Sequence, residues 1–205
     1  MNYIICATTP IGILENGQGE ENTTVTTDGL VSNDLIRMIK GYEGFGEYKY
    51  YLGDGVTTYG YGVTLENCPE HFNMLGPEPT SEKLATEVLI DLVNTKYAKL
   101  VKEQMLKDGV DIKSVPQNVF DAFTDLCYNT GMYNSSLYKK WLANRQDETI
   151  YTDWLEYIIM SGSQFEQGLR ARRKAEADIF KYGTYEKRTI SKVGGGTVEG
   201  DGYLP

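Results

Sequence analysis

Glu43 is the first residue whose type and position indicate chemistry, because it falls in the last turn of a predicted helix that Gly44 ends. A carboxyl there faces the negative end of the helix dipole, which disfavours its ionisation, and burial beside Tyr42 and Phe45 would act in the same direction. A carboxylic acid that keeps its proton can donate it to the leaving oxygen of a glycosidic bond, usually with a second carboxylate across the sugar. Most glutamates near helix ends are solvated surface charges, so the surrounding elements must decide.

The elements predicted around Glu43 are a helix and a hairpin. Ser32 or Asn33 can cap the helix and Gly44 can stop it, and the apolar residues between them follow helical spacing: Leu35, Ile36, Met38, Ile39 and Tyr42. Residues 48–52 and 56–61 are aromatic and β-branched runs joined by Gly53-Asp54-Gly55, which is typical of a hairpin. A small sheet is therefore expected directly after the helix.

The rest of the chain is predicted to be helical. Apolar spacing and Gly stops indicate a long helix from Thr80 that could connect two lobes, a helix from Pro116 to Gly131, shorter helices over 136–144 and 149–160, and a last helix from Gly168 to Lys181. The chain has no internal repeat. The layout predicts an α+β fold, mainly α, with a small β lobe and a larger helical lobe.

Composition divides the chain into three parts. Residues 1–30, rich in Gly, Asn, Thr and Glu toward their end, are predicted to be an N-terminal extension, and residues 31–187 the folded domain. Residues 188–205 contain two Gly-rich runs and are predicted to be a tail or linker, which suggests that a longer protein continues beyond them. At 205 residues, one compact core is the working hypothesis.

Charge and hydropathy exclude several classes of protein. A net charge of -9 argues against a nucleic-acid binder, which needs clustered Lys and Arg. No stretch approaches the roughly 20 apolar residues of a membrane span, and the N-terminus does not resemble a signal peptide. Cys6, Cys68 and Cys127 are widely spaced with only His71 to join them, so we expect free thiols, no metal site, and His71 in a loop.

The segment from Tyr42 to Thr64 resembles the active-site hairpin of the phage-type lysozymes, glycoside hydrolase family 24. The matching residues are Tyr42-Glu43-Gly44-Phe45, Tyr50, Gly55 and Thr58-Tyr59-Gly60-Tyr61-Gly62-Val63-Thr64. The family pattern is Glu, eight residues, Asp, five residues, Thr, followed by a Gly-Tyr-Gly-like segment. Glu43 and Thr58 fall in register on the family's acid and on the threonine that positions water.

The second half of the chain matches the same family in the same order. Residues 117–123 and Tyr128-Asn129-Thr130-Gly131 look like its central helix, and residues 168–176 look like its arginine-rich closing helix. Together the matches span Leu35 to Gly183. The resemblance implies a lysozyme-like fold in which the sheet lobe and the helical lobe flank a cleft, with neither a metal nor a cofactor.

One position departs from the family pattern. The aspartate is expected at position 52, where this chain has Leu52, which can neither attack nor accept a proton. Asp54 lies two residues later, about 7 Å further along a continued strand, and its flanking glycines let the backbone turn it toward the cleft. Inverting enzymes hold their carboxylates about 6.5–9.5 Å apart, so Asp54 suits a general base that activates water; equally, Asp between two glycines is a common turn residue.

The resemblance also implies substrate-binding roles in the helical lobe. Asn129 is placed to hydrogen-bond a sugar N-acetyl group, although it could equally cap the end of a helix. Arg170 corresponds to an arginine near the acid in some family members, where it would fix the Glu43 carboxyl through a shared network. Arg172 and Glu176 are four residues apart, which predicts a local ion pair.

The function implied by the resemblance is cleavage of peptidoglycan between N-acetylmuramic acid and N-acetylglucosamine, by inversion with Asp54 as base. Leu52 keeps two alternatives open: a wall-binding module without activity, and a lytic transglycosylase, which dispenses with the second carboxylate and forms a 1,6-anhydro product. We expect a protein made in the bacterial host cytoplasm that acts at the cell wall. It would be a released endolysin or a lysozyme module of a larger phage tail protein.

Overall fold

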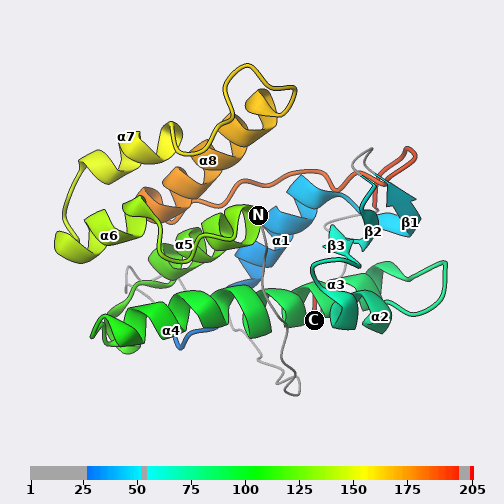
Figure 1. The fold of residues 1–205 in the computed structure, drawn as a ribbon, viewed down its shortest axis with the longest axis horizontal. Coiled ribbons are helices and arrows are strands. Elements are labelled where there is room, and N and C mark those ends of the chain that lie inside the picture. The colour runs from blue at the N-terminus through cyan, green and yellow to red at the C-terminus, as the bar shows by residue number, and fades with distance from the viewer. Residues whose placement is uncertain (1–26, 52–54, 199–203) are drawn as a thin grey trace. The chain divides into compact units, whose positions relative to one another are not determined.

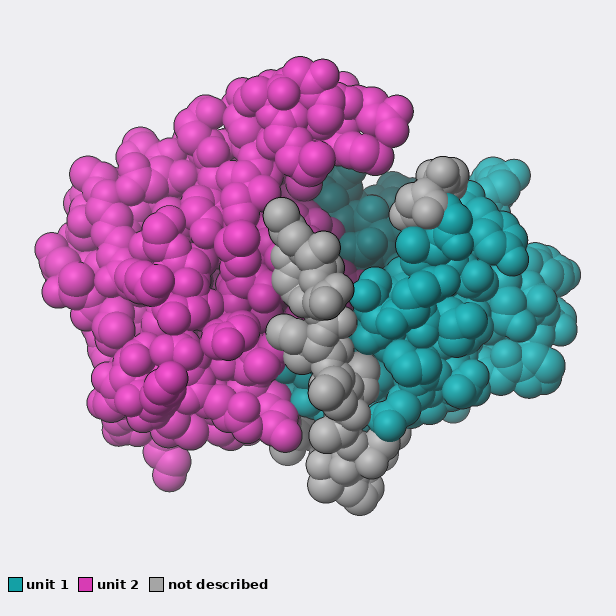
Figure 2. Space-filling view, viewed as in Figure 1, with its two compact units in different colours: residues 1–23, 36–96, 187–205 teal, residues 24–35, 97–186 magenta. Residues whose placement is uncertain are grey.

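The computed structural model of the chain describes residues 27–51, 55–198 and 204–205 (Figure 1). Two compact units are present, coloured separately in Figure 2. Unit 1 comprises residues 1–23, 36–96 and 187–205, and unit 2 comprises residues 24–35 and 97–186. Each unit is described by itself below.

Helix α1, Asn33–Glu43, leads to the sheet of unit 1. Its start is capped by Ser32, whose Oγ accepts a hydrogen bond from the backbone N–H of Leu35 at 3.2 Å. Its end is set by Gly44, which has a φ of 71° and donates its N–H to the carbonyl of Lys40. The predicted first helix is therefore confirmed at both ends.

The sheet of unit 1 has three antiparallel strands in the order β1, Gly46–Tyr51, β2, Thr57–Gly60, and β3, Val63–Thr64. Thr58 lies directly opposite Tyr50 on one side and opposite Thr64 on the other. Helices α2, Pro69–Met74, and α3, Glu82–Leu92, follow the sheet and contact it. Tyr59 and Tyr61 are fully buried in this unit.

Residues 188–198 pack on the start of the sheet. The backbone N–H of Phe45 donates to the carbonyl of Ser191 at 2.8 Å, and the N–H of Val193 donates to the carbonyl of Phe45 at 2.9 Å. Ile190 is 2% exposed. This part of the region that we predicted to be a tail or linker is therefore part of unit 1.

Unit 2 is helical. A π-helical segment, η1, Val93–Ala98, precedes α4, Lys99–Lys107. The second segment of unit 2 begins at Tyr97, inside η1. The other elements are η2, Ile112–Ser114, α5, Gln117–Thr130, α6, Ser136–Ala143, α7, Thr149–Leu155, and α8, Glu166–Tyr182. Helix α8 packs on α5 and α7, around an aromatic core of Phe123, Tyr138, Trp141, Trp154 and Phe180.

The predicted fold class, α+β and mainly α with a small sheet, is confirmed. Two local predictions were wrong. The helix expected over 149–160 ends at Leu155, and Ile158 and Met160 adopt positive φ values of 49° and 48°, which no α-helix contains. His71 was expected in a loop, but it lies in α2 and is 2% exposed. Its ring nitrogen Nε2 lies 3.1 Å from Oδ2 of Asp91, and this pairing gives the buried ring a polar partner. Among the described residues, no helix has the length and apolar character that a membrane crossing requires.

Candidate functional site

Glu43, the last residue of α1, lies against the turn between β2 and β3. A Cβ added to Gly62 in that turn would be 2.8 Å from Oε2 of Glu43, which is closer than real Cβ atoms approach. Gly62 also has a φ of +75°, which glycine adopts without strain. The absence of a side chain at position 62 therefore makes the room in which the Glu43 carboxyl sits, half-buried at the helix end.

Tyr50 of β1 shares the surroundings of Glu43. Burial raises the pKa of Tyr50 to about 12, and the negative charge of Glu43 acts in the same direction. The Tyr50 ring lies over Gly46, where an added Cβ would be 2.5 Å from Cε1 of the ring. Two glycines, Gly46 and Gly62, thus accommodate the tyrosine and the glutamate.

Thr58 lies on the same face of the sheet as Tyr50, because residues directly opposite each other in an antiparallel pair point to one side. Its side chain is buried, and its hydroxyl has no hydrogen-bond partner within the part of the chain that is described. Glu43, Tyr50 and Thr58 are therefore grouped on one part of unit 1. Leu52 and Asp54 lie outside the described residues, so the role of Asp54 stays a prediction.

A buried polar network holds the end of α1 in unit 1. Lys40, which is 0% exposed, donates to Oε1 of Glu82 at 2.6 Å, and Tyr61 donates to the same oxygen at 2.8 Å. The Thr86 hydroxyl is a third donor at 2.9 Å. Burial lowers the pKa of Lys40, and burial together with the Glu82 carboxylate raises the pKa of Tyr61. This network ties the helix that carries Glu43 to the turn beside it and to α3.

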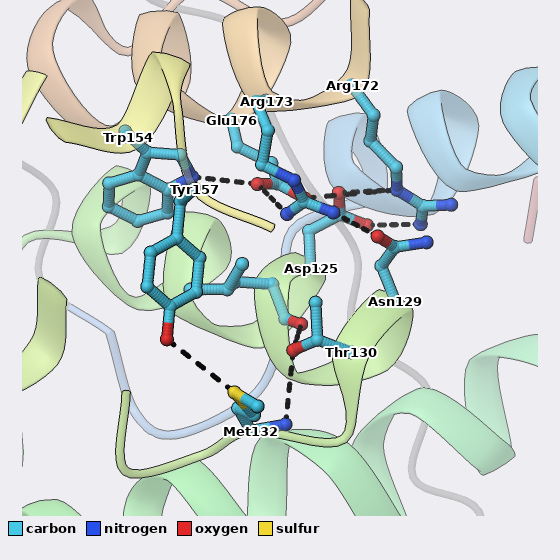
Figure 3. Close-up of polar contacts among 10 residues, drawn as sticks. Asp125, Asn129, Thr130, Met132, Trp154, Tyr157, Arg172, Arg173 and Glu176 are labelled. Atoms are coloured by element: carbon cyan, nitrogen blue, oxygen red, sulfur yellow. Dashed lines mark hydrogen bonds and ion pairs between the residues drawn. The ribbon is translucent and has the colours of Figure 1, made fainter. Parts of the chain in front are cut away.

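In unit 2, Asn129 in the last turn of α5 contacts a buried charged cluster (Figure 3). Arg173 donates from Nη2 to Oδ1 of Asn129 and from Nη1 to Oε2 of Glu176. The indole Nε1 of Trp154 donates to the same Glu176 oxygen at 2.7 Å. The Asn129 side chain is therefore an acceptor for an arginine of α8 rather than a helix cap.

Arg172 and Asp125 complete the cluster. Arg172 donates from Nε to Oδ2 of Asp125 at 3.1 Å and from Nη2 to Oδ1 at 2.8 Å, a bidentate pair. Burial alone would raise the pKa of Asp125, but the Arg172 guanidinium, together with Glu176 and Arg173, outweighs burial and lowers it. Burial raises the pKa of Glu176 to about 8; Arg173 opposes this shift, and the Asp125 carboxylate adds to it. The predicted ion pair between Arg172 and Glu176 is present only as a long contact of 3.9 Å, since Arg172 binds chiefly to Asp125.

Arg170, the arginine to which the resemblance gave a role, has an exposed side chain. It donates from Nε to Glu166 at 2.9 Å and from Nη1 to Glu156 at 3.2 Å. Within unit 2, the ion-pair partners of Arg170 are therefore Glu156 and Glu166. Its predicted role toward Glu43 stays a prediction.

Neither a metal centre nor a disulfide is found in the described ranges. No group of three or more His, Cys, Asp or Glu side chains within residues 27–51, 55–198 and 204–205 could hold a metal ion. Cys68 and Cys127 are buried thiols, and Cys6 lies outside the described residues.

Sequence analysis gave no roles to Tyr50, Gly62, Asp125 and Arg173. Gly62 and Tyr50 were visible as parts of the matched motif, and a glycine in such a motif is a signal that another group must approach the backbone closely. Asp125 and Arg173 carried no such signal. Asp125 pairs with Arg172 and Arg173 pairs with Asn129, each across more than 40 positions, which periodicity does not reveal.

One family model matches more than half of the chain. The family model described as phage lysozyme matches residues 40–176. The chain is similar to the solved structure of an endolysin from Escherichia coli O157:H7 phage FAHEc1, with 24% identity, a TM-score of 0.51, and coverage of 79% of this chain and 99% of that one. The active form of the P1 phage endolysin Lyz is also similar, with 20% identity, a TM-score of 0.49, and coverage of 75% and 85%. No curated protein matches the chain.

Proposed function

Since the chain belongs to the phage lysozyme family, whose members lyse peptidoglycan, we propose that it hydrolyses the glycan strand between N-acetylmuramic acid and N-acetylglucosamine. Glu43 is the general acid in this proposal. It gives its proton to the bridging oxygen as the bond to the anomeric carbon breaks. The reaction needs only one water molecule besides the glycan.

The observation that carries the proposal is the place of the Glu43 carboxyl. It lies against the bare backbone of Gly62, beside the half-buried ring of Tyr50, at the end of a helix that the Lys40–Glu82 pair holds. A proton donor must keep one geometry while the bond breaks, and contacts of this kind around the carboxyl and its helix hold that geometry. An ordinary solvated surface glutamate would have no such surroundings.

The proposed mechanism is inversion. Water attacks the anomeric carbon from the face opposite Glu43, and its proton passes to Asp54 as general base. The Thr58 hydroxyl, which lacks a partner among the described residues, positions this water. Asn129 and Arg170 are proposed to contact substrate from unit 2.

The first test is turbidity loss of purified peptidoglycan with wild type and Glu43→Gln. The amide keeps the shape of the carboxyl but has no acidic proton, so we expect the rate to fall by about 100-fold or more at unchanged melting temperature. Glu47→Gln, four residues along the chain in β1, is the matched control and should stay near wild type. Near-normal clearing by Glu43→Gln would remove it from the role.

Product analysis decides the bond and the mechanism. A reducing end at muramic acid, found by borohydride reduction and mass spectrometry, is expected; a reducing glucosamine would contradict the proposed bond. A 1,6-anhydro end, lighter by one water, would indicate a lytic transglycosylase, the alternative that Leu52 favours. Net retention in the NMR spectrum of the first product anomer would contradict inversion, and tight binding without clearing would indicate a wall-binding module.

The protein acts on the cell wall, and two routes of delivery are proposed: a released endolysin or a module of a phage tail protein. An antibody against this chain that labels purified virions would favour the tail module. Labelling confined to the lysate would favour the endolysin.

A further inference from the structure

Among the described residues, only one of the two polar atoms of the Asn129 amide makes a hydrogen bond. Its Oδ1 accepts the hydrogen bond from Arg173, and its Nδ2 has no hydrogen-bond partner among the described residues (Figure 3). The residue is half-buried at the C-terminal end of α5, which Gly131 terminates in the left-handed conformation. The amide nitrogen is the part of the side chain that is available to a ligand.

The chemistry of arginine determines which face is open. A guanidinium only donates hydrogen bonds, so it can pair with the oxygen of an amide but never with its nitrogen. Turning the Asn129 amide by 180° would place two donors against each other and leave Nη2 of Arg173 without an acceptor. Asparagine by itself presents either a donor or an acceptor; beside Arg173 it presents a donor.

Arg173 is in turn held in place by buried groups. It is 0% exposed, and Glu176, which accepts its second hydrogen bond, is also 0% exposed and accepts from Trp154 at 2.7 Å. The neighbouring Arg172 is occupied by its bidentate pair with Asp125 and cannot replace it. The guanidinium therefore has no alternative position from which to release Asn129.

We infer that Arg173 is a positioning residue that orients Asn129, so that this site recognises a hydrogen-bond acceptor, an amide carbonyl oxygen of the peptidoglycan. The inference rests on the proposed function for the nature of the ligand. Peptidoglycan offers such a carbonyl in two places, the acetamido group of each sugar and the stem peptide. A substrate hydroxyl that must donate would be rejected.

The test is a binding measurement in the Glu43→Gln background, which separates recognition from turnover. The probes are three soluble peptidoglycan strands: intact, N-deacetylated, and freed of stem peptides by an amidase. If the acetamido carbonyl is recognised, deacetylation should weaken binding by about tenfold; if the peptide carbonyl is recognised, peptide removal should do so. Either outcome supports the inference, and no effect of either treatment overturns it.

Two variants then test the residues. Asn129→Asp keeps the acceptor for Arg173 but has no N–H, so it should bind the intact strand about tenfold more weakly and lose the sensitivity to the decisive treatment. Arg173→Lys keeps the buried charge beside Glu176 but lacks the fork that spans two acceptors, and should show the same loss. Asn144→Asp and Arg145→Lys, exposed residues of unit 2, are the matched controls and should keep the parent's sensitivity.

A merely structural role for Arg173 would give a different result. If Arg173→Lys keeps both the parent's melting temperature and its sensitivity to the decisive treatment of the strand, the positioning role is refuted. If that variant does not fold, side-chain amide NMR of the parent decides: the Asn129 Nδ2 signals should shift with the intact strand, and unchanged signals overturn the inference. A wild type that binds selectively but never hydrolyses would contradict the proposed function while leaving this inference standing.

Discussion

Both units bury charge, but they do so in different ways. In unit 1 a single carboxylate, Glu82, collects donors from Lys40, Tyr61 and Thr86 on one oxygen, and its side chain is still 20% exposed. In unit 2 two carboxylates and two guanidinium groups are all 5% exposed or less. Within that cluster, Nε of Arg173 and Oε1 of Glu176 have no hydrogen-bond partner among the described residues.

The polar network of unit 1 and the charged cluster of unit 2 therefore have different roles. The network of unit 1 has one acceptor with neighbouring solvent, so the loss of one donor can be relieved by water. The cluster of unit 2 is sealed, and the charge of Arg172 depends on the single carboxylate of Asp125. We conclude that the first network chiefly fixes the geometry of the helix end beside Glu43. The second is costly to maintain, and such cost is typical of groups that orient a functional side chain.

The largest effect is expected from Asp125→Ala, which breaks the sealed cluster. Arg172 is left buried without its bidentate partner, so the free energy of unfolding should fall by about 3–5 kcal/mol. Urea unfolding measures this change. Asp153→Ala removes an exposed partner of Lys140 and should cost about 0–1 kcal/mol. Equal losses for the two variants would contradict the contrast between the units.

A smaller effect is expected from Lys40→Met in unit 1. Methionine fills the space of the lysine stem, and Glu82 keeps two hydroxyl donors and access to solvent. The free energy of unfolding should therefore fall by about 1–2 kcal/mol in urea. Lys83→Met, which removes an exposed ion pair with Glu87, is the control and should leave the free energy of unfolding nearly unchanged. A loss from Lys40→Met as large as that from Asp125→Ala would mean that unit 1 has no compensating donors.

The last prediction is a pH dependence of the sealed cluster in unit 2. Because the folded-state pKa of Glu176 is raised to about 8, the folded chain holds a proton that the unfolded chain has released. This group thus stabilises the fold fully below its unfolded pKa, and that contribution is lost as pH rises through the folded pKa. Melting temperatures of wild type and Glu176→Gln should converge near pH 4 and diverge by pH 8, with the variant higher.

A pH profile of wild type parallel to that of Glu176→Gln would count against the raised pKa. The control is Glu156→Gln, an exposed partner of Arg170, which should follow wild type at every pH.

Local patterns predicted the part of the site that depends on short sequence separations. The cap at Ser32, the stop at Gly44 and the hairpin after it are neighbours in the chain, and they were sufficient to place Glu43 at a helix end. The matched spacing then brought Thr58 to the strand opposite Tyr50. These predictions rest on turn chemistry and strand register, which a single sequence displays directly.

Long-range pairing of polar residues could not be predicted. Lys40 occupies an apolar face of α1, and only the structure shows that Glu82, 42 positions later, compensates its charge. Arg173 is likewise buried, and only the structure shows that it pairs with Asn129, 44 positions earlier in the chain. Periodicity indicates which face is buried but not which buried charges will meet.

Phe45 has its N–H and its carbonyl both bonded to residues 191–193, almost 150 positions further along the chain. A nascent chain that ends before Ser191 has neither of these bonds, although Glu43, two residues from Phe45, was translated long before. The corner that carries Glu43 is therefore completed only after almost 150 further residues have been synthesised, so the order of translation itself delays its assembly.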